Sequence, residues 1–185
     1  MTWDDRLADL FEDLEQQAEG LHLAERDAEL VDRSRSEYAG VTLAGRLHAS
    51  AGATVTLSVT GVGPLEGRLA RVGVDWCLLE TSPAGQEWVV AMAAVKQASG
   101  LSERAVNEVA RTVVGRLPLR SALRGLADSR SDVLLHHVDG TRLRGRLARA
   151  GADFVEVVPQ LDDVPARARP VEVVPLSTLA AVRRT

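Results

Sequence analysis

A ten-residue segment occurs twice in this sequence, and the repeat constrains the fold more than any other feature. The segment GRLARVGVDW at 67–76 returns as GRLARAGADF at 145–154, an offset of 78 positions. The same offset aligns apolar residues upstream of the two segments without a gap: Val55 with Val133, Leu57 with Leu135, and Leu65 with Leu143. Self-similarity at a fixed period indicates that one supersecondary unit has been duplicated.

The repeat continues downstream with a short insertion in the second copy. Residues 89–92 match residues 173–176 at an offset of 84, so the second copy contains six additional residues. We place them in a loop over residues 159–170, because that stretch contains Pro159, Pro165 and Pro170.

Each copy has the alternating apolar pattern of short β-strands. Five strands are expected in the first copy, with Gly67 allowing a sharp bend in the second strand, and such strands can close a small barrel. Asp139-Gly140 predicts a hairpin turn in the second copy.

A helix is expected on the N-terminal side of each barrel in the sequence. A short helix over residues 119–126 corresponds to the segment at 41–47 before the first copy. A further linker helix is predicted between Ser102 as N-cap and Gly115 as stop. Its apolar residues follow at helical spacing: Val106, Val109, Ala110, Val113 and Val114.

The strand pattern, the G-x-L-x-x-x-G-x-D-aromatic segment and the strand that follows it resemble Sm-like and SH3-like barrels. The resemblance covers residues 53–98 and 131–183, and the whole chain resembles an actinobacterial protein family with two tandem barrels of this kind. It implies a mainly β fold with α: two tandem five-stranded barrels, each preceded by helix. Sm-like RNA binders place an Asp where this chain has Gly73 and Gly151, and no Asn follows. The residues of their RNA pocket therefore cannot be assigned here.

The N-terminal segment has a different character. Residues 1–39 carry four arginines and twelve carboxylates, a net charge of −8, whereas the rest of the chain carries +4. Apolar residues at heptad spacing predict a long helix with oligomerisation candidates Leu7, Leu10, Leu14 and Leu21. The sequence favours neither of two interpretations of this helix: it forms a dimerising coiled coil, or it packs on the barrels of its own chain. The predicted domains are residues 1–39 (acidic helical arm), 40–99 (first helix and barrel) and 100–185 (linker helix and second barrel).

The sequence contains no catalytic constellation that we recognise. His136 and His137 are adjacent, so on a strand they point to opposite faces and are poorly placed to chelate one ion. Cys77 is the only cysteine and is expected to be a buried thiol. Asp75 and Asp153 could contact a ligand, but we favour their interpretation as turn residues that accept hydrogen bonds from backbone N–H groups. We therefore expect no enzyme activity, no metal and no cofactor.

The best functional candidates are arginines in the two repeats. Arg68 and Arg71 recur as Arg146 and Arg149, and Arg144 is added in the second copy. They could contact phosphates of a nucleic acid. The alternative, which we favour, is that they form a solvated face paired with nearby carboxylates.

The expected function is that of a non-enzymatic binding or scaffolding protein, with its barrel surfaces facing a protein partner. A nucleic-acid-associated regulator is the second hypothesis, with the acidic arm as an intramolecular competitor. The chain has no recognisable secretory signal and no long apolar run, so a cytoplasmic location away from membranes is expected.

Overall fold

The computed structural model describes residue 35 and residues 38–82, 85–160 and 170–185. Residues 1–41 and 42–185 form two separate units, and the second unit contains every strand described below. The predicted acidic helix, with Leu7, Leu10, Leu14 and Leu21, lies outside the described residues.

The second unit begins with a short helix and five strands. The elements are α2 (Leu43–Ala49), β1 (Thr54–Val59), β2 (Gly63–Val72), β3 (Trp76–Thr81), β4 (Gln86–Ala91), a 3₁₀ turn (Met92–Ala94) and β5 (Val95–Ser99). The same order follows in the second repeat: α3 (Leu119–Asp128), β6 (Asp132–His137), β7 (Arg142–Ala150), β8 (Phe154–Pro159), β9 (Glu172–Pro175), a 3₁₀ turn (Leu176–Thr178) and β10 (Leu179–Arg184).

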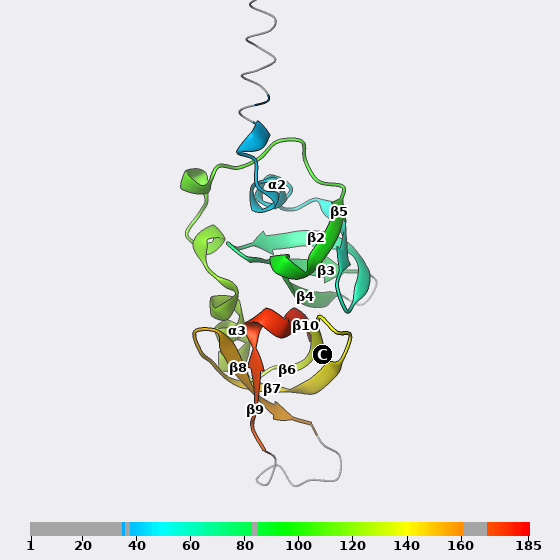
Figure 1. Cartoon of the computed structure of the whole chain (residues 1–185), viewed down its shortest axis with the longest axis vertical. Coiled ribbons are helices and arrows are strands. Elements are labelled where there is room, and N and C mark those ends of the chain that lie inside the picture. Colours follow the sequence, from blue (N-terminus) through cyan, green and yellow to red (C-terminus); the bar gives the residue numbers. More distant parts are fainter. Residues whose placement is uncertain (1–34, 36–37, 83–84, 161–169) are drawn as a thin grey trace, which may run out of the picture. The chain divides into compact units, whose positions relative to one another are not determined.

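All ten strands form one antiparallel sheet in the order β5-β1-β2-β3-β4-β10-β6-β7-β8-β9 (Figure 1). We call β5-β1-β2-β3-β4 the first half-sheet and β10-β6-β7-β8-β9 the second half-sheet. They are joined because β4 pairs with β10, with Val90 opposite Ala181 and Trp88 opposite Arg183. The sheet is not closed, and β5 and β9 are its two ends. The fold is therefore mainly β, but the two closed barrels expected from the sequence are not confirmed.

The repeat read from the sequence is confirmed in the strand pairing. Arg68 lies opposite Glu80 in the first half-sheet, and the equivalent Arg146 lies opposite Val158 in the second. Both β2–β3 and β7–β8 shift register at the same repeat position, after Leu69 and Leu147 respectively. Equal registers, including equal bulges, mean that the two half-sheets have the same local geometry.

Gly67, where the sequence predicts a bend, lies at a close approach of two neighbouring strands. A Cβ atom added at Gly67 would lie 2.5 Å from the carbonyl oxygen of Glu80 on β3. At Gly145 it would lie 2.5 Å from the carbonyl oxygen of Val158 on β8. Only glycine allows neighbouring backbones to approach this closely in the middle of a strand.

The core is built from the inward-facing residues of the strands together with one face of α2 and α3. Leu47 of α2 and Leu123 of α3 are fully buried. The largest fully buried side chains on the strands are aliphatic: Val55, Leu57, Val59, Leu69, Leu79, Val90, Val133, Leu135, Leu147 and Val155. Trp76 and Trp88 are buried beside them. A core of Val and Leu follows from a composition with only 3% aromatic residues.

The linker helix predicted between Ser102 and Gly115 is wrong. This stretch contains only two short 3₁₀ turns, Glu108–Ala110 and Val114–Arg116. Val109 and Val113 are 83% and 81% exposed, so the predicted apolar face is not buried against anything described. β-branched residues are poor helix formers without such packing, and the Val106 amide bonds instead to the Gly45 carbonyl at 2.9 Å.

Candidate functional site

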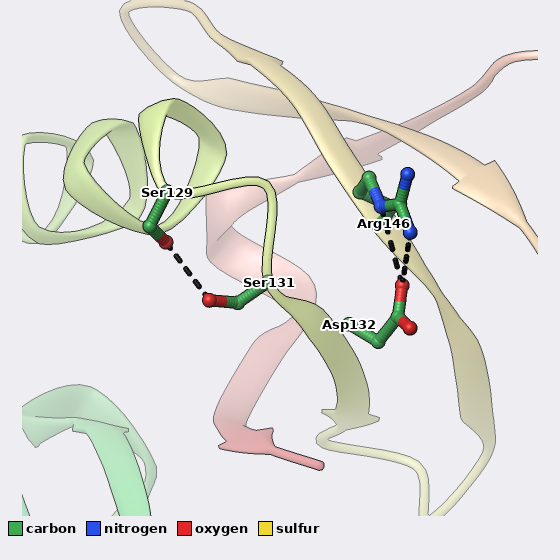
Figure 2. Close-up of polar contacts among 4 residues, drawn as sticks. All are labelled: Ser129, Ser131, Asp132 and Arg146. Atoms are coloured by element: carbon green, nitrogen blue, oxygen red, sulfur yellow. Dashed lines mark hydrogen bonds and ion pairs between the residues drawn. The ribbon is translucent and has the colours of Figure 1, made fainter.

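Three of the five candidate arginines are held in ion pairs on the surface of the sheet. Arg68 on β2 donates to Glu80 on β3 at 2.7 Å. Arg146 on β7 directs both Nε and Nη2 to Asp132 at the start of β6, at 3.2 and 3.0 Å (Figure 2). Arg149 holds both carboxylate oxygens of Glu156 at 2.8 and 3.0 Å, which raises the pKa of its guanidinium. These contacts agree with the alternative that we favoured, a solvated face of charge pairs.

Arg71 differs from Arg149, although the two occupy the same repeat position. The residue opposite Arg149 on β8 is Glu156, whereas the residue opposite Arg71 on β3 is Leu78. Arg71 is exposed and forms no ion pair with a described residue. The first repeat thus lacks the carboxylate that neutralises this arginine in the second repeat.

Arg71 lines a cavity of about 570 Å³ that is open to solvent and lies beside α2, β2 and the linker. Most of the lining is aliphatic, with Val72, Val106 and Val114 among it, and no described acidic residue takes part. The polar groups come from His48, Arg71, Arg111 and Thr112. The cavity therefore combines an apolar wall with cationic groups.

Arg111 is the most unusual residue of this cavity. It is only 8% exposed, and its Nε atom is buried without a hydrogen-bond partner among the described residues. His48 Nε2 is likewise buried without a partner there. Burial and the nearby Arg111 charge lower the pKa of His48, so its imidazole is neutral at pH 7. A Cβ atom added at Gly115 would lie 2.7 Å from His48 Cε1, so glycine leaves room for this ring.

A second, open groove of about 800 Å³ lies where the two half-sheets join. Arg144, Arg183 and Arg184 line it together with Glu87, which pairs with Arg184 at 3.1 Å. Arg144 is exposed and forms no ion pair with a described residue. Arg183 lies over the Trp88 ring, 5.5 Å from its centroid, and thereby connects β10 to β4.

His136 lies in the same junction and is 3% exposed. Its ring is 5.1 Å from the Trp88 ring, and neither nitrogen has a hydrogen-bond partner in the described part of the chain. Burial, followed by the charges of Arg142, Arg183 and His137, lowers the pKa of His136 to about 4. The residue is therefore a neutral member of the junction, on the opposite face of β6 from the half-buried His137.

The free end of the sheet at β9 carries exposed apolar side chains. Val171 and Val173 are 53% and 60% exposed. Val89 occupies the position equivalent to Val173 in the first repeat, and it is only 6% exposed because β10 pairs with β4 there. The same repeat position is thus covered by a strand in one half-sheet, whereas no described strand pairs with the outer edge of β9 in the other.

Asp75 accepts a backbone hydrogen bond, as predicted, but from a distant segment. Its Oδ1 atom receives the amide of Leu119, the first residue of α3, at 2.6 Å. No side-chain hydrogen bond links Asp153 to a described residue, and only its carbonyl is used, by the Leu176 amide at 2.8 Å. The carbonyl groups of both aspartates therefore accept equivalent backbone hydrogen bonds, but only the Asp75 side chain accepts one from a described residue.

Replacing Asp75 with alanine should lower the free energy of unfolding by about 1 kcal/mol, the usual contribution of a side chain that caps a helix. The Leu119 amide, at the start of α3, would lose its partner. Asp153→Ala should change stability by less than about 0.5 kcal/mol and serves as the repeat-matched control. Urea denaturation of both variants measures the difference, and equal losses would contradict the capping role.

The remaining chemistry-bearing residues form no further site in the described part of the chain. Cys77 is buried as expected, and burial raises the pKa of its thiol to about 12, which disfavours the nucleophilic thiolate. Within the described ranges, no three His, Cys, Asp or Glu side chains gather as a metal site would require. None of the described helices has the length and apolar character needed to cross a bilayer.

Sequence reasoning identified Arg71 and Arg144 but missed Arg111, His48 and the β9 edge. Arg111 lay inside the stretch taken for a helix, so its burial was not foreseen. One signal was available: the repeat alignment pairs Glu156 with Leu78, which marks Arg71 as the arginine without its carboxylate.

Comparisons with protein-family models, with curated proteins and with solved structures found no match for this chain.

Proposed function

We propose that this protein is a non-enzymatic adaptor that binds an extended segment of a protein partner along β9. The observation that supports this most is the contrast between Val173, which is 60% exposed, and its repeat equivalent Val89, which β10 covers. Adding a strand to an uncovered edge is a common mode of peptide recognition, since the backbone supplies affinity and alternate side chains supply specificity.

The partner's chemistry can be inferred from the strand that covers β4. There, Ala181, Val182 and Arg183 of β10 lie opposite Val90, Val89 and Trp88. The equivalent positions on β9 are Val174, Val173 and Glu172, so an edge partner would meet two valines and a carboxylate. A suitable segment has small apolar residues followed by a basic residue that faces Glu172.

The proposal treats each half-sheet as an Sm-like or SH3-like module that uses its outer strand for pairing. The matching registers of the two half-sheets support this reading. A role at nucleic acid receives less support, because Arg68, Arg146 and Arg149 are already paired with carboxylates. A cytoplasmic location remains part of the proposal.

A peptide with the sequence of residues 176–185 is a suitable probe, because it contains the strand that pairs with β4. The full chain should bind this peptide in a fluorescence anisotropy titration, and Val173→Lys should weaken binding about tenfold or more. A lysine on an edge strand opposes strand addition, and it removes the apolar contact. Val109→Lys is the matched control, because Val109 is 83% exposed but belongs to a 3₁₀ turn and not to an edge strand.

Pull-down with and without nuclease then tests the class of the natural partner. If the protein is an adaptor, the wild type and Val109→Lys should capture the same partner proteins, and nuclease should not reduce this capture. Val173→Lys should fail to capture them. Capture that depends on nucleic acid would favour the alternative function. Equal peptide binding by Val173→Lys and the wild type would reject the β9 edge as the site.

A further inference from the structure

We propose that the cavity between α2, β2 and the linker is a binding site for a small organic anion, a carboxylate on a compact aliphatic body. This site lies on the first repeat and does not depend on the β9 edge. Its essential residues are Arg111 and Arg71, with His48 beside them.

Arg111 carries a buried charge that no described residue neutralises. This residue is 8% exposed, lies in a cavity with no described acidic lining residue, and forms no ion pair with a described residue. A buried guanidinium that no described carboxylate neutralises is costly, so an anion that enters the cavity would relieve this cost. The planar fork of arginine suits a carboxylate, which can accept two parallel hydrogen bonds.

The arginines near Arg111 differ in whether they donate hydrogen bonds to the backbone. Arg116 is engaged with the linker backbone, since its Nε donates to the Arg111 carbonyl at 3.2 Å and its Nη2 to the Val109 carbonyl at 3.1 Å. Arg46 donates to the Ser102 carbonyl at 2.9 Å. Arg71 has no such contact with a described residue, so it remains to meet a ligand together with Arg111.

The two repeats differ in the residue that faces this arginine position. At the position of Arg71, the second repeat has Arg149, which is neutralised by Glu156 at 2.8 Å. The first repeat has Leu78 in place of that glutamate. The exchange removes a carboxylate from one half-sheet only, so Arg71 has no described carboxylate opposite it where it lines the cavity.

The walls define the rest of the ligand. Alanines and valines dominate the lining: Ala51, Ala70, Val72, Val106, Ala110 and Val114. A volume of about 570 Å³ exceeds what a bare ion needs and falls within the range of small-molecule pockets. The apolar wall therefore favours an anion with a short aliphatic chain over an inorganic ion.

Hexanoate is the probe, and isothermal titration calorimetry of the full chain at low ionic strength is the measurement. Hexanoate should bind at least about tenfold more tightly than acetate, because buried methylenes add affinity. Hexanol, which has the chain without the charge, should bind at least about tenfold more weakly than hexanoate. If acetate or inorganic phosphate binds as tightly as hexanoate, the proposed ligand class is wrong.

Three variants assign the binding to this cavity. Arg111→Gln should weaken hexanoate binding about tenfold or more, and Arg71→Gln about threefold to tenfold, because each removes a charge-assisted hydrogen bond. Arg149→Gln is the matched control at the equivalent repeat position and should bind within about twofold of the wild type. If Arg111→Gln does not fold, as circular dichroism would show, the exposed Arg71 still decides the outcome. Unchanged affinity in Arg71→Gln would then overturn the proposal.

Discussion

Replacing both Gly67 and Gly145 with alanine should destabilise the protein by about 4–6 kcal/mol, with about 2–3 kcal/mol lost at each site. At each position the new Cβ would lie 2.5 Å from a backbone carbonyl oxygen of the neighbouring strand. Backbone cannot move aside as a flexible side chain can, so β2 and β3, or β7 and β8, must separate. Urea denaturation of the single and double variants measures the loss.

Gly125 provides the control for this prediction. It lies inside α3, and an added Cβ would meet nothing within 4 Å. Gly125→Ala should therefore stabilise the protein by about 0.5–1 kcal/mol, the usual gain in a helix interior. If Gly67→Ala is as stable as the wild type, the close approach of β2 and β3 is not what requires glycine.

The protein should lose about 2–3 kcal/mol of stability through His136 alone as the pH falls from about 6.5 to about 4. The pKa of this histidine is 6.5 in the unfolded chain and about 4 in the folded protein. Between these values the unfolded state takes up a proton that the folded state does not, so acid favours unfolding. Below about pH 4 both states are protonated and this contribution no longer changes.

Comparing His136→Phe with the wild type isolates this effect from that of the carboxylates. The variant should show a shallower loss of stability between pH 6.5 and pH 4, measured by urea denaturation at several pH values. His137→Phe is the control, since this neighbour is half-buried and on the other face of β6. Parallel pH profiles for His136→Phe and the wild type would show that His136 is not held in its neutral form.

Local features of the sequence predicted the strands well because the repeat and the period of two are both local signals. The strand around Val55–Val59 and the turn at Asp139-Gly140 were confirmed. At Gly67 the structure shows a close approach of β2 to β3, and the predicted bend there stays a prediction. The linker helix failed because helical spacing of valines predicts a helix only if that face is buried, and Val109 and Val113 are exposed.

The sequence could not reveal how the two repeats combine. Each copy predicted a barrel of its own, whereas β4 and β10 pair to make one open sheet. That pairing joins residues about ninety positions apart, such as Val90 and Ala181, and such non-local contacts leave no periodic trace in the sequence.

By itself, then, the sequence determined the duplication, the strand pattern, the repeated strand glycines and the repeated arginines, and the repeat alignment places Leu78 where the second copy has Glu156. Only the tertiary structure showed that Leu78 lies opposite Arg71 and Glu156 opposite Arg149, because the strand register sets which side chains face each other across the sheet. The tertiary structure also decided that Val89 is buried and that its repeat equivalent Val173 is exposed. Val89 and Val173 are identical residues in equivalent strands, and only the neighbour of each strand makes one of them core and the other surface.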